Sequence, residues 1–257
     1  MNSENNTQTF LYTNNKNFLE KYLEKAPISL ALIRAIECKE LSTESYLRPV
    51  LDIGTGEGLF ASILFRDQID VGIDILSDEI KKTSLSEQYL NLIVSNIENV
   101  SLKENLFSTV ISNSVFEHLD DLNNTLREIN RILKKDGVLI FTTYNKSFSK
   151  SLFYNNCIKK LGLHRLASNY SKKVDTIFKH KNLLSIKEWE KMLCANGFEI
   201  IKYKEFLSKN TMNIFGLFLP FSLPNLACKK LINRWKLFTF KVFTFYIDPI
   251  PVLPGAG

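Results

Sequence analysis

Apolar side chains recur every three or four residues between positions 15 and 40, which is the period of a helix that packs one face on a core. Phe18, Tyr22 and Ile36 are among them. Pro27 interrupts the run, and proline is favoured in the first turn of a helix and disfavoured in its interior. The segment therefore predicts a pair of consecutive helices.

From position 49 onward the pattern changes to short apolar runs rich in Val, Ile and Leu, which are typical of buried strands. Segments with helical spacing lie between the runs, over residues 59–65 and 121–135. Strands that alternate with helices form a mainly parallel sheet covered by helices on both faces. The pattern predicts this α/β fold class, with strands at residues 49–53, 69–75, 92–95, 109–113 and 138–143.

The alternation is lost over residues 144–184. It returns with a helix predicted over residues 186–195, which Ser185 begins as a cap, and with a sixth strand predicted over residues 198–206. Residues 207–257 do not continue the pattern, and we expect them to belong to a mostly helical cap.

Charge divides the chain into two unequal parts. Residues 1–145 contain 14 basic and 21 acidic side chains, a net charge of −7, whereas residues 146–257 contain 19 basic and 6 acidic side chains, a net charge of +13. The basic part also holds both tryptophans. This asymmetry indicates an acidic partner, which leaves nucleic acid, a membrane surface and a phosphorylated substrate open.

The four cysteines are widely separated, and no two lie within thirty residues of each other. This spacing is typical of neither a metal site nor a redox pair, so we expect reduced thiols and no bound metal. The start of the chain lacks the features of a secretory signal, and no uncharged apolar run reaches the ~18–20 residues of a membrane-spanning helix. We therefore expect a cytoplasmic protein, free or peripheral on the inner face of the membrane.

A glycine-rich turn follows the first predicted strand, with Gly54, Gly56 and Gly58 at alternate positions. Glycines at the start of a helix let a ligand approach the backbone closely. A dinucleotide site would have its third glycine at position 59, which is Leu59. Asp52, just before the turn, would repel a pyrophosphate, and it favours a ligand with a cationic end such as the ammonium of an amino acid.

This Asp-x-Gly-x-Gly-x-Gly segment resembles the first motif of class I S-adenosylmethionine-dependent methyltransferases, which have a Rossmann-like fold. The resemblance implies that the glycine backbone and Asp52 bind the methionine part of the cofactor S-adenosyl-L-methionine. Asp74 and Ile75, at the end of the second strand, match the family position that binds the ribose hydroxyls. Asn96 and Ile97 match the position that contacts the adenine, where the family more often has Asp.

Two further segments match the family in order. Residues 107–119 resemble the fourth strand and the short helix after it, with Thr109 in place of the usual Asp, and imply that Asn113 and Ser114 line the methionine end of the cofactor. Residues 126–140 resemble the helix, turn and fifth strand that follow. Each match has a structural alternative: the glycines shape a turn, Asp74 caps a strand, Asn96 is a polar loop residue, and Asn113 and Ser114 cap a helix.

Two side chains are candidates for catalysis. His118 lies where the family's fourth-strand loop meets substrate, and a histidine there would take a proton from a hydroxyl acceptor. The alternative is that His118 packs against Phe116 and solvent. Tyr144, just after the fifth strand, is a second candidate for facing the substrate.

The resemblance, together with the shift in charge near residue 145, divides the chain into four regions. They are an N-terminal helical segment (1–48), the cofactor-binding α/β core (49–145), a cap insertion with the end of the core (146–206) and a basic aromatic segment (207–257). The implied function is methyl transfer to oxygen or carbon of a small or lipid-linked metabolite. A nucleic-acid methyltransferase, a non-catalytic binding module of the same fold and a nicotinamide oxidoreductase are the alternatives.

The last region has three interpretations. Apolar side chains at helical spacing between Leu231 and Phe245, mixed with lysines and Arg234, are typical of a helix that lies on an anionic membrane surface. The same stripe would also pack on the core, and the alternation over residues 237–246 would suit a seventh strand.

Overall fold

The computed structural model of the chain describes residues 9–14 and 17–232, with side chains through residue 222. A parallel sheet lies at its centre, with the strand order β5-β4-β3-β6-β7. The strands are β3 (Val50–Ile53), β4 (Ile69–Asp74), β5 (Tyr89–Val94), β6 (Phe107–Asn113) and β7 (Leu133–Thr142). The five strands predicted from the apolar runs are all present.

The strand order reverses beside the central strand β3. From β3 the chain builds outward through β4 and β5 on one side, and then through β6 and β7 on the other. In open α/β sheets the loops that leave the carboxyl ends of strands at such a reversal point diverge and leave a crevice where ligands bind. The topology therefore places the loops after β3, β4 and β6 around a common crevice.

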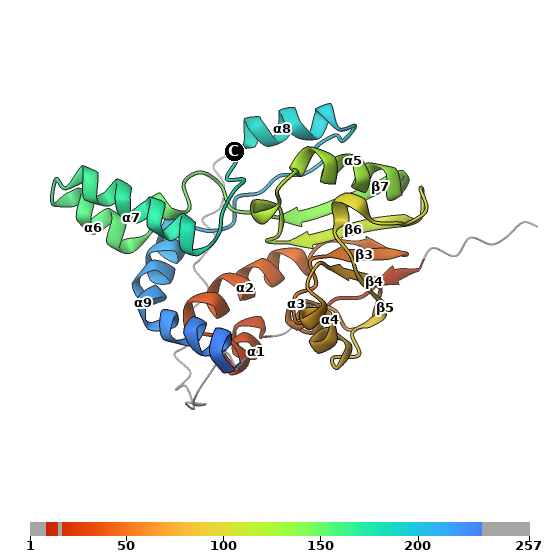
Figure 1. Cartoon of the computed structure of the whole chain (residues 1–257), viewed down its shortest axis with the longest axis horizontal. Helices are drawn as coiled ribbons and strands as arrows, with labels where there is room; N and C mark the ends of the chain where they lie inside the picture. Colours follow the sequence, from red (N-terminus) through yellow and green to blue (C-terminus); the bar gives the residue numbers. More distant parts are fainter. Residues whose placement is uncertain (1–8, 15–16, 233–257) are drawn as a thin grey trace, which may run out of the picture.

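Side chains of β3 alternate between two hydrophobic cores. Val50 packs in the core with the N-terminal helices, while Leu51 and Ile53 pack in the core on the opposite face. Helices α1 (Phe18–Lys25), α2 (Ile28–Leu41), α3 (Leu59–Leu64) and α4 (Ser77–Ser84) lie on one side of the sheet, and α5 (Leu122–Ile132) and α8 (Ile186–Ala195) on the other (Figure 1). Both faces are covered, as the alternation of elements predicts.

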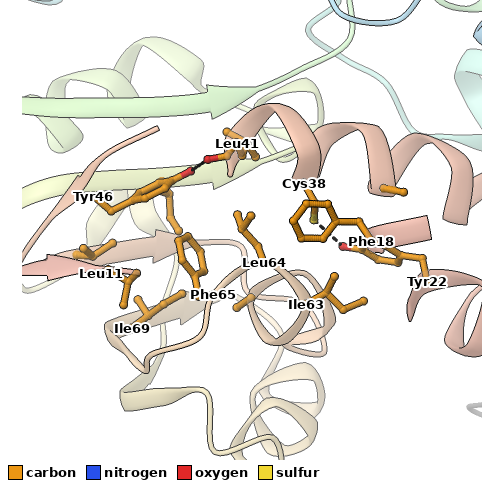
Figure 2. Close-up of a cluster of buried hydrophobic side chains, with 14 of the residues drawn as sticks. Leu11, Phe18, Tyr22, Cys38, Leu41, Tyr46, Ile63, Leu64, Phe65 and Ile69 are labelled. Carbon is orange, nitrogen blue, oxygen red and sulfur yellow. Dashed lines mark hydrogen bonds between the residues drawn. The ribbon is translucent and has the colours of Figure 1, made fainter. Parts of the chain in front are cut away.

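The predicted N-terminal helical pair is confirmed, with Pro27 directly before α2. Figure 2 shows how it joins the core: Phe18 and Tyr22 lie against Cys38, and the Tyr22 hydroxyl is 3.5 Å from the Cys38 sulfur. Near the far end of α2, the Tyr46 hydroxyl donates to the Leu41 carbonyl at 2.7 Å. These contacts hold α2 along the sheet, where its Glu37 side chain reaches the end of β6.

A helical cap follows β7. It comprises α6 (Phe153–Lys160), α7 (His164–Ile177) and α9 (Lys209–Ile232), and α6 and α7 lie on the side to which β7 points (Figure 1). A third cluster of buried side chains, including Ile33 of α2 with Phe148 and Phe215, joins the cap to the N-terminal pair. The cap is therefore anchored close to the carboxyl ends of the strands.

The predicted sixth strand is wrong. In the part of the chain that the structure describes, no strand follows β7, and residues 198–206 run without a ladder. The side chains of this segment make other contacts. Phe198 and Ile200 pack on the core, while Lys202 and Lys204 form ion pairs with acidic residues at the end of α2 and just beyond it.

One boundary also differs from prediction. The helix predicted over residues 121–135 ends at Ile132, because Leu133 already belongs to β7, opposite Phe107.

The cap helix α9 continues through Pro220. Its buried positions, Met212, Phe215, Leu219 and Ser222, recur at helical spacing, so packing against the cap outweighs the cost of proline. Trp235 and the alternative strand over residues 237–246 lie outside the described residues.

Candidate active site

The three glycines of the turn between β3 and α3 all have positive φ, of 78°, 53° and 74° in order. They differ in what a side chain would meet. A Cβ at Gly54 would lie 2.4 Å from a methyl group of Val115, and one at Gly58 would lie 3.0 Å from Thr83 Cγ2. A Cβ at Gly56 would meet no atom within 4 Å. Gly54 and Gly58 are therefore needed for packing, and Gly56 alone faces open space.

Asp74, at the end of β4, is tied directly to this turn. Its Oδ2 accepts a hydrogen bond from the Gly56 N–H at 2.8 Å, and its Oδ1 accepts one from the Leu76 N–H at 2.9 Å. Thr83 donates to the Gly56 carbonyl at 2.6 Å and fixes the other side of the turn. The structure thus brings the first two sequence motifs into contact, and each carboxylate oxygen keeps a lone pair for a further donor.

Asp52 lies beneath the turn and has only 2% of its surface exposed. Its carboxyl group accepts a 2.5 Å hydrogen bond from the Tyr89 hydroxyl. Burial raises the pKa of Asp52 to about 7, the Tyr89 hydrogen bond opposes this, and the charge of Asp74 adds to it. In this arrangement Asp52 supports the turn from inside the protein, and its contact with a cofactor stays a prediction.

The two positions predicted to hold ribose and adenine follow neighbouring strands, since Asp74 pairs with Val94. Ile75 is 63% exposed just beyond β4. Asn96 caps the short helix η1 (Ile97–Asn99) by accepting from the Glu98 N–H at 3.0 Å, and its contact with an adenine stays a prediction. Ile97 is buried in the core, so among these side chains Ile75 offers an apolar surface to a ligand.

Asn113 and Ser114 lie at the end of β6, and a carboxylate of the N-terminal pair occupies their polar atoms. Ser114 Oγ donates to Glu37 Oε1 at 3.1 Å, and Asn113 Nδ2 donates to Glu37 Oε2 at 3.3 Å. Arg34 pairs with the same carboxylate at 2.7 Å. Glu37 was missed from the sequence, where its one signal is that it is an acid in an apolar helix. The contact of Asn113 and Ser114 with a cofactor stays a prediction.

Glu117, in the short helix η2 (Phe116–His118), was also missed. It has no exposed surface, its Oε2 accepts from Thr143 Oγ1 at 3.2 Å, and its Oε1 has no hydrogen-bond partner within the described part of the chain. Burial raises the pKa of Glu117 to about 7, and the Thr143 hydrogen bond and Arg34 oppose that shift. A buried carboxyl oxygen without a hydrogen-bond partner destabilises the fold unless it is protonated or a ligand donates a hydrogen bond to it.

The structure brings the two catalytic candidates together. The His118 ring stacks on the ring of His180 with centroids 5.7 Å apart, and the Tyr144 ring lies 5.4 Å from His180. His118 is half exposed, and its Nδ1 lies 3.2 Å from the Lys179 carbonyl oxygen. Burial raises the pKa of Tyr144, which keeps its hydroxyl protonated at neutral pH. His180 was not a candidate from sequence, because nothing near it in the chain marked it.

Across residues 9–14 and 17–232, no group of three or more His, Cys, Asp or Glu side chains is placed to hold a metal ion. No helix in those ranges combines the length and the apolar character needed to cross a membrane.

Comparison with known proteins decides the family. A family model described as a methyltransferase domain matches residues 17–203, from α1 through α8 and the segment after it. The chain belongs to this methyltransferase family. It is an S-adenosylmethionine-dependent enzyme of the Rossmann-like class, as the order of its motifs predicted.

Individual relatives of this methyltransferase are distant. An uncharacterized protein of Methanocaldococcus jannaschii is 30% identical over 202 residues, covering 72% of this chain and 77% of that protein. The malonyl-acyl-carrier-protein O-methyltransferase of Priestia megaterium is 29% identical over 133 residues, 48% of each chain, so the match spans about half of that enzyme. The crystal structure of the 4+2 cyclase SpnF, 17% identical with a TM-score of 0.54, covers 86% of this chain and 74% of its own, and confirms the fold alone.

The buried acid Glu117 makes a pH-dependent contribution to stability. Its pKa is raised from 4.5 to about 7 on folding. A carboxyl group whose pKa is raised on folding stabilises the fold at pH values below its pKa in the unfolded chain. This contribution to the free energy of unfolding is lost as the pH rises through the pKa of the folded protein, and the loss is about 3 kcal/mol between pH 5 and pH 8. Between pH 5 and pH 8, we expect the free energy of unfolding of Glu117→Gln to fall less than that of the wild type, by about 3 kcal/mol.

Urea unfolding of the cofactor-free protein at both pH values measures the difference. Asp52 titrates in the same window and remains in both proteins, so it cancels in the comparison. Glu190→Gln, an exposed change on α8, is the control and should follow the wild type. If the free energy of unfolding falls equally in the wild type and in Glu117→Gln, ionisation of Glu117 does not destabilise the fold.

Proposed function

We propose that this methyltransferase transfers its methyl group to an oxygen or carbon of a small or lipid-linked metabolite. The acceptor would lie between the carboxyl ends of β6 and β7 and the helical cap. The observation that carries the lipid-linked class is a cavity of about 430 Å³ in the cap. It is lined by Tyr154, Ile158, Tyr170, Lys173, Val174, Ile177, Phe178, Leu219 and Pro220.

The character of this cavity suits an alkyl chain. Small-molecule sites typically have volumes of ≈ 300–1,000 Å³ and apolar walls with a few polar groups. Here the polar groups are two tyrosine hydroxyls and Lys173, which has no ion pair within the described residues. At one wall, Phe178 stacks on His180 with centroids 5.6 Å apart, and His180 contacts Tyr144. A chain in the cavity would therefore end beside the candidate catalytic side chains.

The residues around the glycine turn fit the cofactor. The open space at Gly56 admits the amino acid part against the backbone, the free lone pairs of Asp74 suit two ribose hydroxyls, and exposed Ile75 suits the face of an adenine. When bound, S-adenosylmethionine supplies a methyl group on a sulfonium sulfur, and the electron pair of the broken carbon–sulfur bond stays on sulfur. The remaining tasks of the protein are to align the acceptor, exclude water and remove a proton.

The experiment is transfer from methyl-labelled S-adenosylmethionine to a total cell extract, followed by separation of lipid, aqueous and nucleic-acid label. We expect label in the lipid fraction. Ile177→Asp, which places a charge in the cavity wall, should reduce this label, and Leu166→Asp, on the same helix but outside the cavity, should not. Label confined to the aqueous fraction would exclude a lipid-linked acceptor, and label on nucleic acid would favour that alternative.

A second proposal concerns an anionic membrane surface as a partner. The cap exposes apolar and basic side chains along its helices and in the turn between α6 and α7, and we call them together the basic cap surface. None of these basic residues forms an ion pair within the described residues. The surface comprises Leu161, Leu163, Leu166, Ile177 and Phe221 with Lys159, Lys160, Arg165, Lys172 and Lys173. The arrangement supports peripheral contact with the inner face of a membrane.

We expect the protein to sediment with vesicles of anionic lipid at low salt and not with neutral vesicles. Each basic side chain near the surface contributes ~1 kcal/mol, screened over roughly 10 Å at moderate salt, so binding should weaken as salt rises. Leu161→Ser/Leu166→Ser should weaken it about tenfold through lost apolar burial. Leu85→Ser, at an 84% exposed site on α4, is the matched control. If the protein does not bind anionic vesicles at low salt, a soluble molecule remains as the class of methyl acceptor.

A further inference from the structure

His180 belongs to a chain of polar side chains that the family motifs do not include. Its imidazole has no exposed surface, and its Nδ1 lies 3.3 Å from Asp175 Oδ1. The other oxygen of Asp175 accepts a hydrogen bond from Ser149 Oγ at 2.9 Å. A carboxylate only accepts, so this contact places the single proton of the neutral imidazole on Nδ1 and leaves a lone pair on Nε2.

The Nε2 atom of His180 has no hydrogen-bond partner among the described residues, although it is buried. Such an atom is costly in a folded protein, and where it persists it calls for a functional explanation. Glu117 Oε1 is buried without a partner as well, and it lies 4.0 Å from His118 Nε2, while the His118 ring stacks on His180. The unpartnered atoms of His180 and Glu117 therefore flank the His118 side chain.

The backbone holds His180 at the carboxyl end of the sheet. The N–H groups of Lys181 and Asn182 both donate to the Glu117 carbonyl, at 2.7 Å and 3.1 Å. Asn182 Nδ2 also donates to the Phe116 and Leu119 carbonyls. The segment after α7 is thus fastened to η2, directly beyond β6, and His180 reaches this place from the cap rather than from the sheet.

We propose that His180 Nε2 is the general base that takes the proton of a hydroxyl acceptor, with Asp175 and Ser149 as positioning residues. This rests on the proposed methyl transfer to oxygen. The O–H bond breaks, its proton moves to Nε2 and its electron pair forms the new O–CH₃ bond. The imidazolium, paired with the Asp175 carboxylate, then returns the proton to solvent. No oxidant or further reactant is needed.

The groups around His180 favour it over the other candidates. Burial lowers its pKa and Asp175 opposes that shift, so the imidazole is neutral at neutral pH and can accept a proton. His118, Tyr144 and Asp175 face its ring or nitrogen, and Lys179 and Lys181 flank it in sequence. Tyr144 keeps its proton, and the Nδ1 of His118 is engaged with the Lys179 carbonyl. His180 is the imidazole that combines a carboxylate partner with a free buried nitrogen.

The first test is independent of methyl transfer. Nuclear magnetic resonance of the protein with isotope-labelled histidines reports the tautomer and pKa of each ring. We expect the Nδ1–H tautomer for His180, and a further lowering of its pKa in Asp175→Asn, because the stabilising charge is lost. A proton on Nε2, or a pKa of His180 that does not respond to Asp175→Asn, would overturn the dyad.

The second test uses label transfer to the extract. General-base catalysis typically contributes 10²–10⁴-fold, so His180→Gln should lower the transfer rate at neutral pH at least ~100-fold and remove the acidic limb of the pH profile. Affinity for S-adenosylmethionine should change less than about threefold. His164→Gln, on the exposed surface of α7, is the control.

Transfer by His180→Gln within about fivefold of the wild type would overturn the proposal. If the wild-type protein labels nothing, the proposed function fails instead, and the resonance measurement still decides whether the dyad exists.

Discussion

Gly56→Val is expected to lower the affinity for S-adenosylmethionine at least ~100-fold, about 2.7 kcal/mol, while the domain stays folded. A side chain at position 56 would project into space that no protein atom occupies within 4 Å, where the cofactor's amino acid part is proposed to lie. The positive φ of 53° adds backbone strain of about 1–3 kcal/mol for a β-branched residue, which lowers stability without removing the fold. Isothermal calorimetry measures the affinity, and circular dichroism reports the fold.

Gly162→Val is the matched control for this change. Gly162 also has a positive φ, of 75°, and a Cβ there would likewise meet nothing within 4 Å, but it lies between α6 and α7 in the cap. The two variants should lose similar stability, and only Gly56→Val should lose the cofactor. Wild-type affinity in a folded Gly56→Val protein would mean that the turn is purely structural.

Asp74→Ala is expected to weaken cofactor binding by on the order of 2–3 kcal/mol, or roughly 30- to 150-fold. The substitution removes a carboxylate proposed to accept from two ribose hydroxyls. It also removes the acceptor of the Gly56 N–H, which holds the glycine turn at the end of β4. Asp78→Ala, an 82% exposed acid in the first turn of α4, is the control for a change of charge near the site. An Asp74→Ala protein that binds within about threefold of the wild type would contradict the role of this carboxylate.

The sheet was predictable because its strands are short apolar runs separated by segments of a different period. A mostly helical cap was expected and α9 is part of it, but α6 and α7 were not located from the sequence, and their buried positions explain why. Helix α7 buries Ala167, Ser171 and Val174, and α6 buries Asn155, so neither carries a stripe of large apolar residues. Their cohesion comes from tertiary contacts such as Ser171 Oγ donating to Asn155 Oδ1 at 3.2 Å. Hydrophobic periodicity alone does not detect such helices.

The candidate site divides in the same way. The contact between the glycine turn and Asp74, where the cofactor is proposed to bind, was predictable because both lie in contiguous motifs whose strands are neighbours. The proposed acceptor half includes Glu117 of η2 and His180 of the cap, which are distant in sequence and both lie beside His118 only in the folded chain. His118, the histidine nearest a motif, was the candidate base from the sequence. His180, buried beside it, is better suited as a base, because Asp175 contacts its Nδ1 and its Nε2 is without a partner among the described residues.

The central claim is that the turn around Gly56 and Asp74 binds S-adenosylmethionine, and direct calorimetric titration tests it. The purified protein is titrated separately with S-adenosylmethionine, with its demethylated product and with NAD. We expect saturable binding of the first two ligands and none of NAD, because position 59 is leucine and Asp52 lies beneath the turn. Binding of NAD without binding of S-adenosylmethionine would contradict the account.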